Sequence, residues 1–510
     1  MTAALLCAGQ RLDGAQVDAL VARCAASLRA AGVREGDAVG LLLRNEPRLL
    51  VAMLAARRVG AYAVPVNWHF QAAEAGAILA DAGLRLLFVH ASLLAGVQDT
   101  LPPGATVVLL EDPPALCEDY RLDPPSAVPA GLACWEDWLA PQPDTGEPAA
   151  PRTAMSYTSG TTGQPKGVRR APMTPDHARR VAEVNREAFG LEPGARVMVV
   201  TPLYHSAPVA YAMQAMAVAE CLVVEPRFEA ERCLARIAQH RISHLYLVPT
   251  LMHRLLKLPP SVRERHDLSS LRFVLHGAAP CPPEVKRTLI AWWGPVVHEF
   301  YGGGEAGPVA AIGSAQWLRK PGSVGRPLPH ARVCIADAQG VELPRGATGT
   351  IYVEQRAYPG FTYHGRPELR AACTHPRDPA LFTLGDMGHV DEDGFLYISD
   401  RSKDMVISGG VNIFPAEIEA ALATMPGVRD CAVFGVPDEE FGEALLAVVE
   451  PEGEAGLDGA QVQAWLRARV AGYKVPRRVE FRTGLPREDS GKIFKRRLRE
   501  PYWQAAGRRI

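Results

Sequence analysis

Apolar positions along the first 70 residues follow two periods in turn. From Val17 to Leu28 they recur at three- and four-residue spacing, which predicts a helix that ends near Gly32. Residues 39–43 and 62–66 are short apolar runs typical of buried strands, and residues 47–57 predict a helix with Pro47 in its first turn. Strands that alternate with helices favour parallel sheets covered on both faces, so we expect an α/β fold.

The same alternation returns in the middle of the chain and then changes. Short apolar runs at residues 196–201, 222–225, 244–248 and 273–276 predict four more strands. From residue 332 to about 400, short strands separated by Gly/Pro turns predict a small β-rich unit. The segment 113–152 is rich in Pro, Asp and Ala, which predicts an excursion on the surface.

A second domain is expected after Arg401. A helix from about Pro415, strands at 431–435 and 444–450, and a helix at 461–470 predict a compact α+β module. We therefore expect a large N-terminal domain over residues 1–401 and a small C-terminal domain over residues 403–510.

Composition excludes several classes of function. The 510 residues carry a formal net charge of −1, which gives no support for nucleic-acid binding as the main task. The ten cysteines include no CxxC pair, so neither a disulfide framework nor a structural zinc site is expected. No apolar run reaches membrane-spanning length and the N-terminus lacks a basic region, so we expect a cytoplasmic protein without a transmembrane segment.

The strongest local signal is the segment from Tyr157 to Gly167. Its glycines let backbone N–H groups converge on an anion, and its hydroxyls and lysine add donors and positive charge. The segment is therefore predicted to cradle phosphate, through Thr158, Ser159, Gly160, Thr161, Thr162, Gly163 and Lys166. It lacks the GxxxxGK[ST] order of a P-loop, which argues against a P-loop kinase.

This loop and the motifs after it, in their order, resemble the adenylate-forming superfamily of acyl-CoA synthetases, peptide-synthetase adenylation domains and luciferases. The stretch 276–283 looks most like that of bacterial fatty-acid or sterol-acid CoA ligases. The resemblance covers nearly the whole chain. It implies activation of a carboxylic acid by ATP as an acyl-adenylate, followed by transfer of the acyl group to coenzyme A.

The resemblance also implies the nucleotide contacts. Backbone edges at Gly277, Ala278 and Ala279 would meet adenine, and Tyr301, beside Gly302, would stack on it. Asp386 and Arg401 would hold the ribose hydroxyls, since an ionised carboxylate accepts two hydrogen bonds. Glu305 would bind Mg²⁺, a hard cation suited to carboxylate oxygen. Gly304 stands where the family has a threonine whose hydroxyl reaches the α-phosphate.

The C-terminal motifs imply two conformations. Lys403 matches the family's hinge, Gly409 and Gly410 match the strand that lies along the pantetheine arm of coenzyme A, and Lys492 matches the catalytic lysine. A rotation about the hinge would bring Lys492 to the site for adenylation and the glycine strand for thioester formation.

The acid is less closely specified. His205 would lie beside the substrate carboxylate, and with Lys492 and Glu305 it completes the expected catalytic set. We expect the acyl pocket to include His205, Tyr246, His276, Gly303 and Gly304. The pocket region is mostly apolar or small, which suits a hydrophobic tail. Medium- to long-chain fatty acids are favoured, followed by aromatic and steroid side-chain acids.

Two alternatives to the CoA ligase stay open. A free-standing adenylation enzyme would use the same motifs to load a carrier protein. A non-catalytic nucleotide-binding relative would retain the fold alone, and Gly304 is its single support. The expected ligands are ATP, Mg²⁺, coenzyme A and a small carboxylic acid, and assembly as a homodimer is left open.

Overall fold

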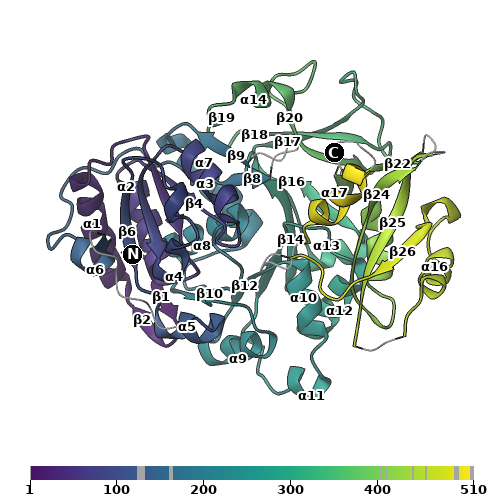
Figure 1. Ribbon diagram of the computed structural model, residues 1–510, viewed down its shortest axis with the longest axis horizontal. Coiled ribbons are helices and arrows are strands. Elements are labelled where there is room, and N and C mark those ends of the chain that lie inside the picture. Colours follow the sequence, from purple (N-terminus) through teal and green to yellow (C-terminus); the bar gives the residue numbers. More distant parts are fainter. Residues whose placement is uncertain are drawn as a thin grey trace.

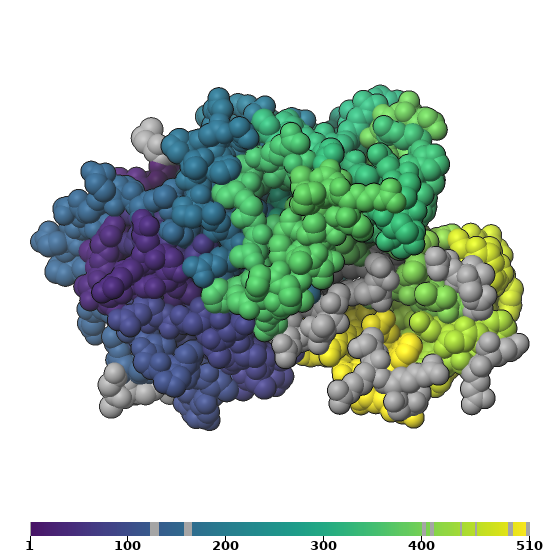
Figure 2. Space-filling model, turned by 90° about the horizontal axis from the view of Figure 1, so that it is seen from above, coloured from purple at the N-terminus to yellow at the C-terminus, as the bar shows by residue number. Residues whose placement is uncertain are grey.

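The chain folds into an N-terminal α/β part and a smaller C-terminal lobe (Figure 1). The computed structural model describes residues 2–122, 132–159, 165–401, 404–408, 411–438, 441–453, 456–487 and 493–505. Figure 2 shows the C-terminal residues gathered in a lobe at one end of the molecule. None of the helices in these ranges is long and apolar enough to cross a membrane.

The first sheet is parallel throughout. Its order is β4 (Tyr62–Pro65), β3 (Ala38–Leu42), β5 (Leu84–His90), β6 (Thr106–Leu110) and β7 (Ala133–Cys134). The segments around these strands contain α1 (Gly14–Ala30), α2 (Pro47–Arg58), α3 (Ala72–Asp81), α4 (Ala91–Leu94), η1 (Gln98–Thr100), α5 (Pro114–Tyr120) and α6 (Trp135–Trp138). The alternation expected from the apolar pattern is therefore confirmed for this part of the chain.

The second sheet is larger and changes direction along its width. Its parallel part contains β1 (Ala4–Cys7), β11 (Cys221–Val224), β10 (Arg196–Val199), β12 (His244–Leu247), β13 (Phe273–His276) and β14 (Val297–Gly303). β2 (Gln10–Leu12) pairs with β1 at one edge. Antiparallel strands continue beyond β14 as β15 (Gly307–Gly313), β16 (Ser323–Pro327), β21 (Leu396–Arg401), β20 (Phe382–Val390), β18 (Gly349–Gln355) and β17 (Ala331–Ala336).

Helices cover both faces of the parallel part. α7 (Pro175–Phe189) and α8 (Ser206–Val218) lie on one face, where the Phe189 and Tyr211 rings are 5.6 Å apart. α12 (Pro283–Trp293) lies on the other face, where Lys286 contacts Glu299 of β14. The remaining helices of this part are α9 (Ala230–His240), α10 (Pro249–Leu256), α11 (Pro260–Arg263), α13 (Ser314–Arg319) and α14 (Pro367–Ala372).

One core joins the two sheets. Leu41 and Phe88 of the first sheet belong to the same buried cluster as Val197 and Leu245 of the second. The segment 113–152 was expected on the surface, but Trp135 within it is 4% exposed and its ring lies 5.3 Å from that of Phe88. Burial of a large aromatic ring outweighs the polar composition around it.

Two smaller sheets complete the fold. β8 (Tyr157–Ser159), β9 (Pro165–Arg170) and β19 (Phe361–Tyr363) form an antiparallel sheet beside the large one. The C-terminal lobe contains β22 (Val406–Ser408), β23 (Val411–Ile413), β24 (Val428–Asp438), β25 (Gly442–Pro451) and β26 (Arg478–Phe481). Its helices are α15 (Pro415–Leu422), α16 (Gly459–Arg467), η2 (Gly472–Lys474) and α17 (Lys495–Ala505).

Candidate active site

A tyrosine–carboxylate pair lies where the parallel and antiparallel strands of the large sheet meet. The Tyr301 hydroxyl of β14 donates to Asp386 Oδ2 of β20 over 2.8 Å. Asp386 is 7% exposed, and its register partner on β21 is Arg401. Three residues expected at the nucleoside thus come together from strands far apart in sequence, although the Arg401 side chain lies outside the described residues.

The loop after β13 is the segment expected to border adenine. A side chain at Gly277 would place its Cβ 2.9 Å from the Phe300 ring, so only glycine fits against β14. Ala278 has a φ of +70°, in the left-handed region that alanine seldom adopts. Strain of about 1–3 kcal/mol of this kind is typical of functional sites, where the surrounding structure holds it.

The glycines after Tyr301 have a packing reason. A Cβ at Gly302 would lie 2.1 Å from the carbonyl oxygen of Gly307, because β14 and β15 approach closely there. A Cβ at Gly303 would lie 3.3 Å from both methyl groups of Leu384 and 3.5 Å from Glu305 Oε2. The space beside Gly303, which the sequence assigns to the acyl pocket, is bounded by these two side chains.

The expected phosphate loop connects the strands of a hairpin. β8 and β9 pair so that Thr158 lies opposite Lys166 and Ser159 opposite Pro165. The loop itself, with Gly160, Thr161, Thr162 and Gly163, lies outside the described residues, as do the side chains of Thr158 and Ser159. The pairing of β8 with β9 therefore places Ser159 and Pro165, the residues on either side of the loop, next to each other.

Lys166 and Glu305 are joined through an aromatic residue. The Lys166 Nζ lies 5.5 Å from the centre of the Tyr363 ring, and the Tyr363 hydroxyl donates to Glu305 Oε1 over 3.0 Å. Within the described part of the chain, Glu305 Oε2 has no protein donor. A partly exposed carboxylate with one oxygen left over fits a hard divalent cation.

Arg170 supports the turn that carries Glu305. It is 5% exposed, and its guanidinium donates to the carbonyl oxygens of Gly304, Glu305 and Pro359. Burial lowers the pKa of Arg170 to about 10. Sequence reasoning missed this residue, because nothing in the motif distinguishes it from the exposed arginines elsewhere.

Asn45 holds the loop that leads to His205. Its side-chain amide donates to the carbonyl oxygens of Thr201 and Glu225, over 2.9 and 3.2 Å, and its oxygen accepts from the Leu203 N–H over 2.8 Å. His205 then occupies the N-cap position of α8, and its ring lies 4.5 Å from that of Tyr204. Asn45 is 5% exposed and joins the two sheets beside the expected carboxylate position.

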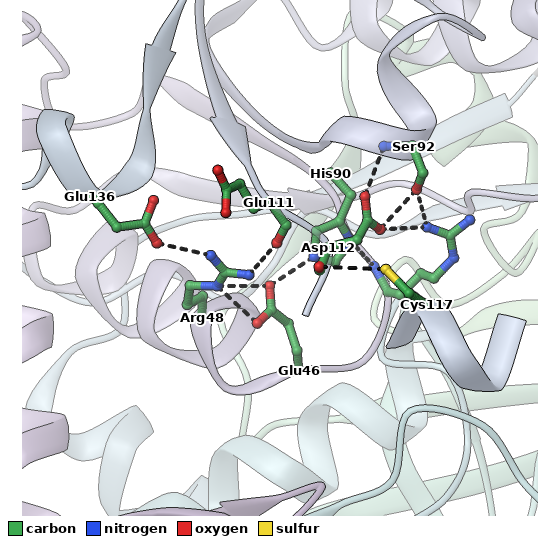
Figure 3. Close-up of polar contacts among 9 residues, drawn as sticks. Glu46, Arg48, His90, Ser92, Glu111, Asp112, Cys117 and Glu136 are labelled. Carbon is green, nitrogen blue, oxygen red and sulfur yellow. Dashed lines mark hydrogen bonds and ion pairs between the residues drawn. The ribbon is translucent and has the colours of Figure 1, made fainter. Parts of the chain in front are cut away.

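A buried polar network fixes the neighbours of Asn45 (Figure 3). His90 Nδ1 accepts from the Arg44 N–H over 3.0 Å, so its proton is on Nε2 and is donated to Glu46 Oε1 over 2.8 Å. Arg48 holds both oxygens of Glu46, at 2.9 and 3.0 Å. Although burial opposes ionisation, the pKa of Glu46 is lowered by His90 and Arg48. The segment after β3 is thus held on both sides of Asn45.

Tyr246 and His276 lie on opposite faces of the sheet. Tyr246 pairs with Leu275, and Leu247 pairs with His276, so alternation sends the two expected pocket residues to different sides. His276 has its Nε2 3.6 Å from Glu299 Oε2, on the α12 face. Tyr246 faces α8, where its ring lies 5.6 Å from that of Tyr211. An acyl pocket on the α8 face would therefore include Tyr246 and not His276.

The remaining predicted residues belong to the C-terminal motifs. Lys403, Gly409, Gly410 and Lys492 all lie outside the described residues. The strands on either side of the two glycines, β22 and β23, pair with each other. The roles of Lys403, Gly409, Gly410 and Lys492 stay predictions.

Comparison with known proteins identifies the family. Residues 2–358 match the AMP-binding enzyme model and residues 417–492 match the AMP-binding enzyme C-terminal domain. A feruloyl-CoA synthase from Amycolatopsis sp is 36% identical, over 97% of this chain and 94% of that protein. A long-chain-fatty-acid–CoA ligase, FadD13, from Mycobacterium tuberculosis is 31% identical, over 96% and 93%.

A solved structure agrees in fold. ATP-bound MatB from Rhodopseudomonas palustris superposes with a TM-score of 0.83 at 30% identity, over 98% of this chain and 96% of that one. Since both family models match and relatives above 30% identity cover nearly the whole chain, the chain belongs to the AMP-binding enzyme family.

Proposed function

We propose that this protein is an ATP-dependent acyl-CoA synthetase. The observation that carries the proposal is the Tyr301–Asp386 hydrogen bond opposite Arg401, beside the β8–β9 hairpin. An ionised carboxylate, which can accept two hydrogen bonds from a 2′,3′-diol, suits a ribose, and the neighbouring aromatic ring suits a base. The family match and the CoA ligases among the relatives support the same reading.

The first half-reaction would activate the acid. A carboxylate oxygen attacks the α-phosphorus of ATP, a bond to that phosphorus forms, and pyrophosphate leaves. The charge that develops on the phosphate oxygens needs cations placed beforehand. Lys166 and Lys492 would supply two of them, and Glu305 would hold Mg²⁺, which supplies further positive charge to these oxygens.

The second half-reaction would transfer the acyl group. The thiol of coenzyme A attacks the acyl carbon, the carbon–oxygen bond to AMP breaks, and AMP leaves with the oxygen. Gly409 and Gly410 would lie along the pantetheine arm, since residues without side chains leave room for it. A turn of the C-terminal lobe about Lys403 would exchange these glycines for Lys492.

A carrier protein is the alternative acceptor. The same adenylation site would serve it, and the residues that hold the nucleotide do not distinguish it from coenzyme A. The nature of the thioester product decides between them.

The test is a panel of carboxylic acids scored for ATP-dependent release of pyrophosphate. We expect at least one acid to support release, and addition of free coenzyme A to yield the acyl-CoA and AMP by mass spectrometry. No release with any acid would contradict the proposed function. Release without acyl-CoA, together with acylation of a carrier protein, would favour the alternative acceptor.

A further inference from the structure

Two tyrosines are buried together behind the His205 loop. Tyr211 of α8 and Tyr246 of β12 are each 0% exposed, and their ring centres are 5.6 Å apart. Val199 and Leu275 pair with Tyr246 from the neighbouring strands, which places its side chain on the face that α7 and α8 cover. This tyrosine pair is the feature from which we infer the class of acid.

Neither hydroxyl of the tyrosine pair has a hydrogen-bond partner among the residues that the structure describes. Seven other tyrosine hydroxyls donate to a protein acceptor, namely those of Tyr62, Tyr120, Tyr157, Tyr301, Tyr358, Tyr363 and Tyr502. A buried polar group without a partner costs about 1–3 kcal/mol. Phenylalanine would fill the same volume without this cost, so a purely apolar pocket does not explain two hydroxyls.

The tyrosine pair lies within reach of a bound acid. Tyr211 is six residues beyond His205, which is a rise of about 9 Å along a helix at 1.5 Å per residue. Helical side chains lean back toward the N-terminus, which brings the Tyr211 hydroxyl closer to the level of His205 along the axis of α8. A group at the far end of a substrate of moderate length would meet the two hydroxyls.

The surroundings favour an aromatic and uncharged group. The Phe189 ring lies 5.6 Å from those of Tyr211 and Phe300, both in edge-to-face orientation, an arrangement that suits a further ring. Burial raises the pKa of Tyr211 and of Tyr246, so both hydroxyls stay neutral near pH 7. A charged group on the substrate would be buried beside neutral hydroxyls, and that is far more costly than a hydroxyl.

We propose, on the basis of the proposed function, that the tyrosine pair selects an aromatic carboxylic acid that carries a ring hydroxyl. The substrate hydroxyl donates to one tyrosine and accepts from the other, which satisfies all three groups. A saturated fatty acid leaves both tyrosines without partners. This inference departs from the fatty-acid preference drawn from the sequence, because composition does not show which hydroxyls are satisfied.

The experiment compares two acids that differ by one hydroxyl, 4-hydroxycinnamate and cinnamate. ATP–pyrophosphate exchange is measured for the wild type, Tyr211→Phe and Tyr246→Phe. We expect the wild type to prefer the hydroxylated acid, and each variant to lose about tenfold to a hundredfold in kcat/KM for it. The value for cinnamate stays the same or rises, since the variants no longer carry an unpaired hydroxyl.

A tyrosine far from the expected pocket provides the control. Tyr502→Phe removes a hydroxyl that donates to Glu480 in the C-terminal lobe, and it should leave the preference between the two acids unchanged. Equal effects of the pocket variants on both acids, as expected if the hydroxyls bind only water, would overturn the inference. So would a wild-type preference for cinnamate or for saturated fatty acids. Failure of the proposed function is distinct, because no acid would then support exchange.

Discussion

Asp386 shows how one side chain of the candidate site is oriented by a neighbour. The Tyr301 hydroxyl donates to one carboxylate oxygen over 2.8 Å, which orients the group on a strand where it is 7% exposed. We predict that Asp386→Ala raises the KM for ATP about tenfold to a hundredfold, because hydrogen bonds to a charged group contribute about 1.5–3 kcal/mol. Initial rates over a range of ATP concentrations provide the measurement.

A surface aspartate serves as the control for that variant. Asp378 pairs with Arg332, and its replacement by alanine removes a carboxylate without touching the nucleotide residues. Asp378→Ala should leave the KM for ATP unchanged. If Asp386→Ala behaves in the same way, the carboxylate does not hold the ribose.

The residues found by motif and those found only in the structure differ in the range of their contacts. Tyr301, Asp386 and Glu305 each stand in a short recognisable string, so the sequence alone indicates them. Asn45 acts on a backbone carbonyl 156 positions away, and Arg170 acts on turns 134 and 189 positions away. Contacts of that range depend on the folded topology and leave no local pattern to read.

At the scale of elements, Asn45 ties the end of β3 to the loop after β10. Its three hydrogen bonds fix Thr201 and Leu203, just before His205, and Glu225, just after β11. We predict that Asn45→Ala lowers kcat/KM for the acid about tenfold or more and leaves the KM for ATP close to the wild-type value. Separate titrations of the two substrates measure this split.

A second amide provides the comparison for Asn45. Gln463 donates to two backbone carbonyls in the C-terminal lobe, those of Pro476 and Arg477. Gln463→Ala loses similar bonds at a distance from the loop and should not alter kcat/KM for the acid. A parallel rise in both KM values for Asn45→Ala would instead indicate general disturbance of the fold.

Elements with a clear apolar pattern were predicted closely, and those interrupted by glycine were not. The strand at residues 273–276 matches β13 in the structure, whereas β20, which carries Asp386, was missed. β20 contains Gly385 and Gly388, and a Cβ at Gly388 would lie 2.0 Å from the Tyr397 carbonyl oxygen. Glycines that let strands approach closely also weaken the alternation by which a strand is recognised.

For the molecule as a whole, the C-terminal lobe is joined to the rest by exposed ion pairs. Lys257 of α10 meets Glu452 over 3.1 Å, and Arg497 of α17 meets Glu74 of α3 over 3.5 Å. Exposed pairs of this kind contribute about 0–1 kcal/mol each. A lobe held by such contacts can exchange positions at little cost, as the proposed two-step reaction requires.

Replacement of Lys492 tests whether the C-terminal lobe exchanges between two arrangements. We predict that Lys492→Ala reduces formation of the acyl-adenylate by a hundredfold or more, because a cation beside the developing charge is lost. Transfer from supplied acyl-adenylate to coenzyme A should be largely retained, since the lysine would serve only the first arrangement. Single-turnover assays of each half-reaction measure the two rates. Equal loss in both would contradict an exchange of arrangements.

The fate of the carboxylate oxygen tests the central claim most directly. If the acid attacks the α-phosphorus and the thiol then breaks the acyl carbon–oxygen bond, one oxygen of the acid remains on AMP. With an acid labelled with ¹⁸O in both carboxylate oxygens, we predict a single labelled oxygen in AMP and none in pyrophosphate by mass spectrometry. Unlabelled AMP, or label in inorganic phosphate with ADP as the product, would contradict adenylation of the acid by this protein.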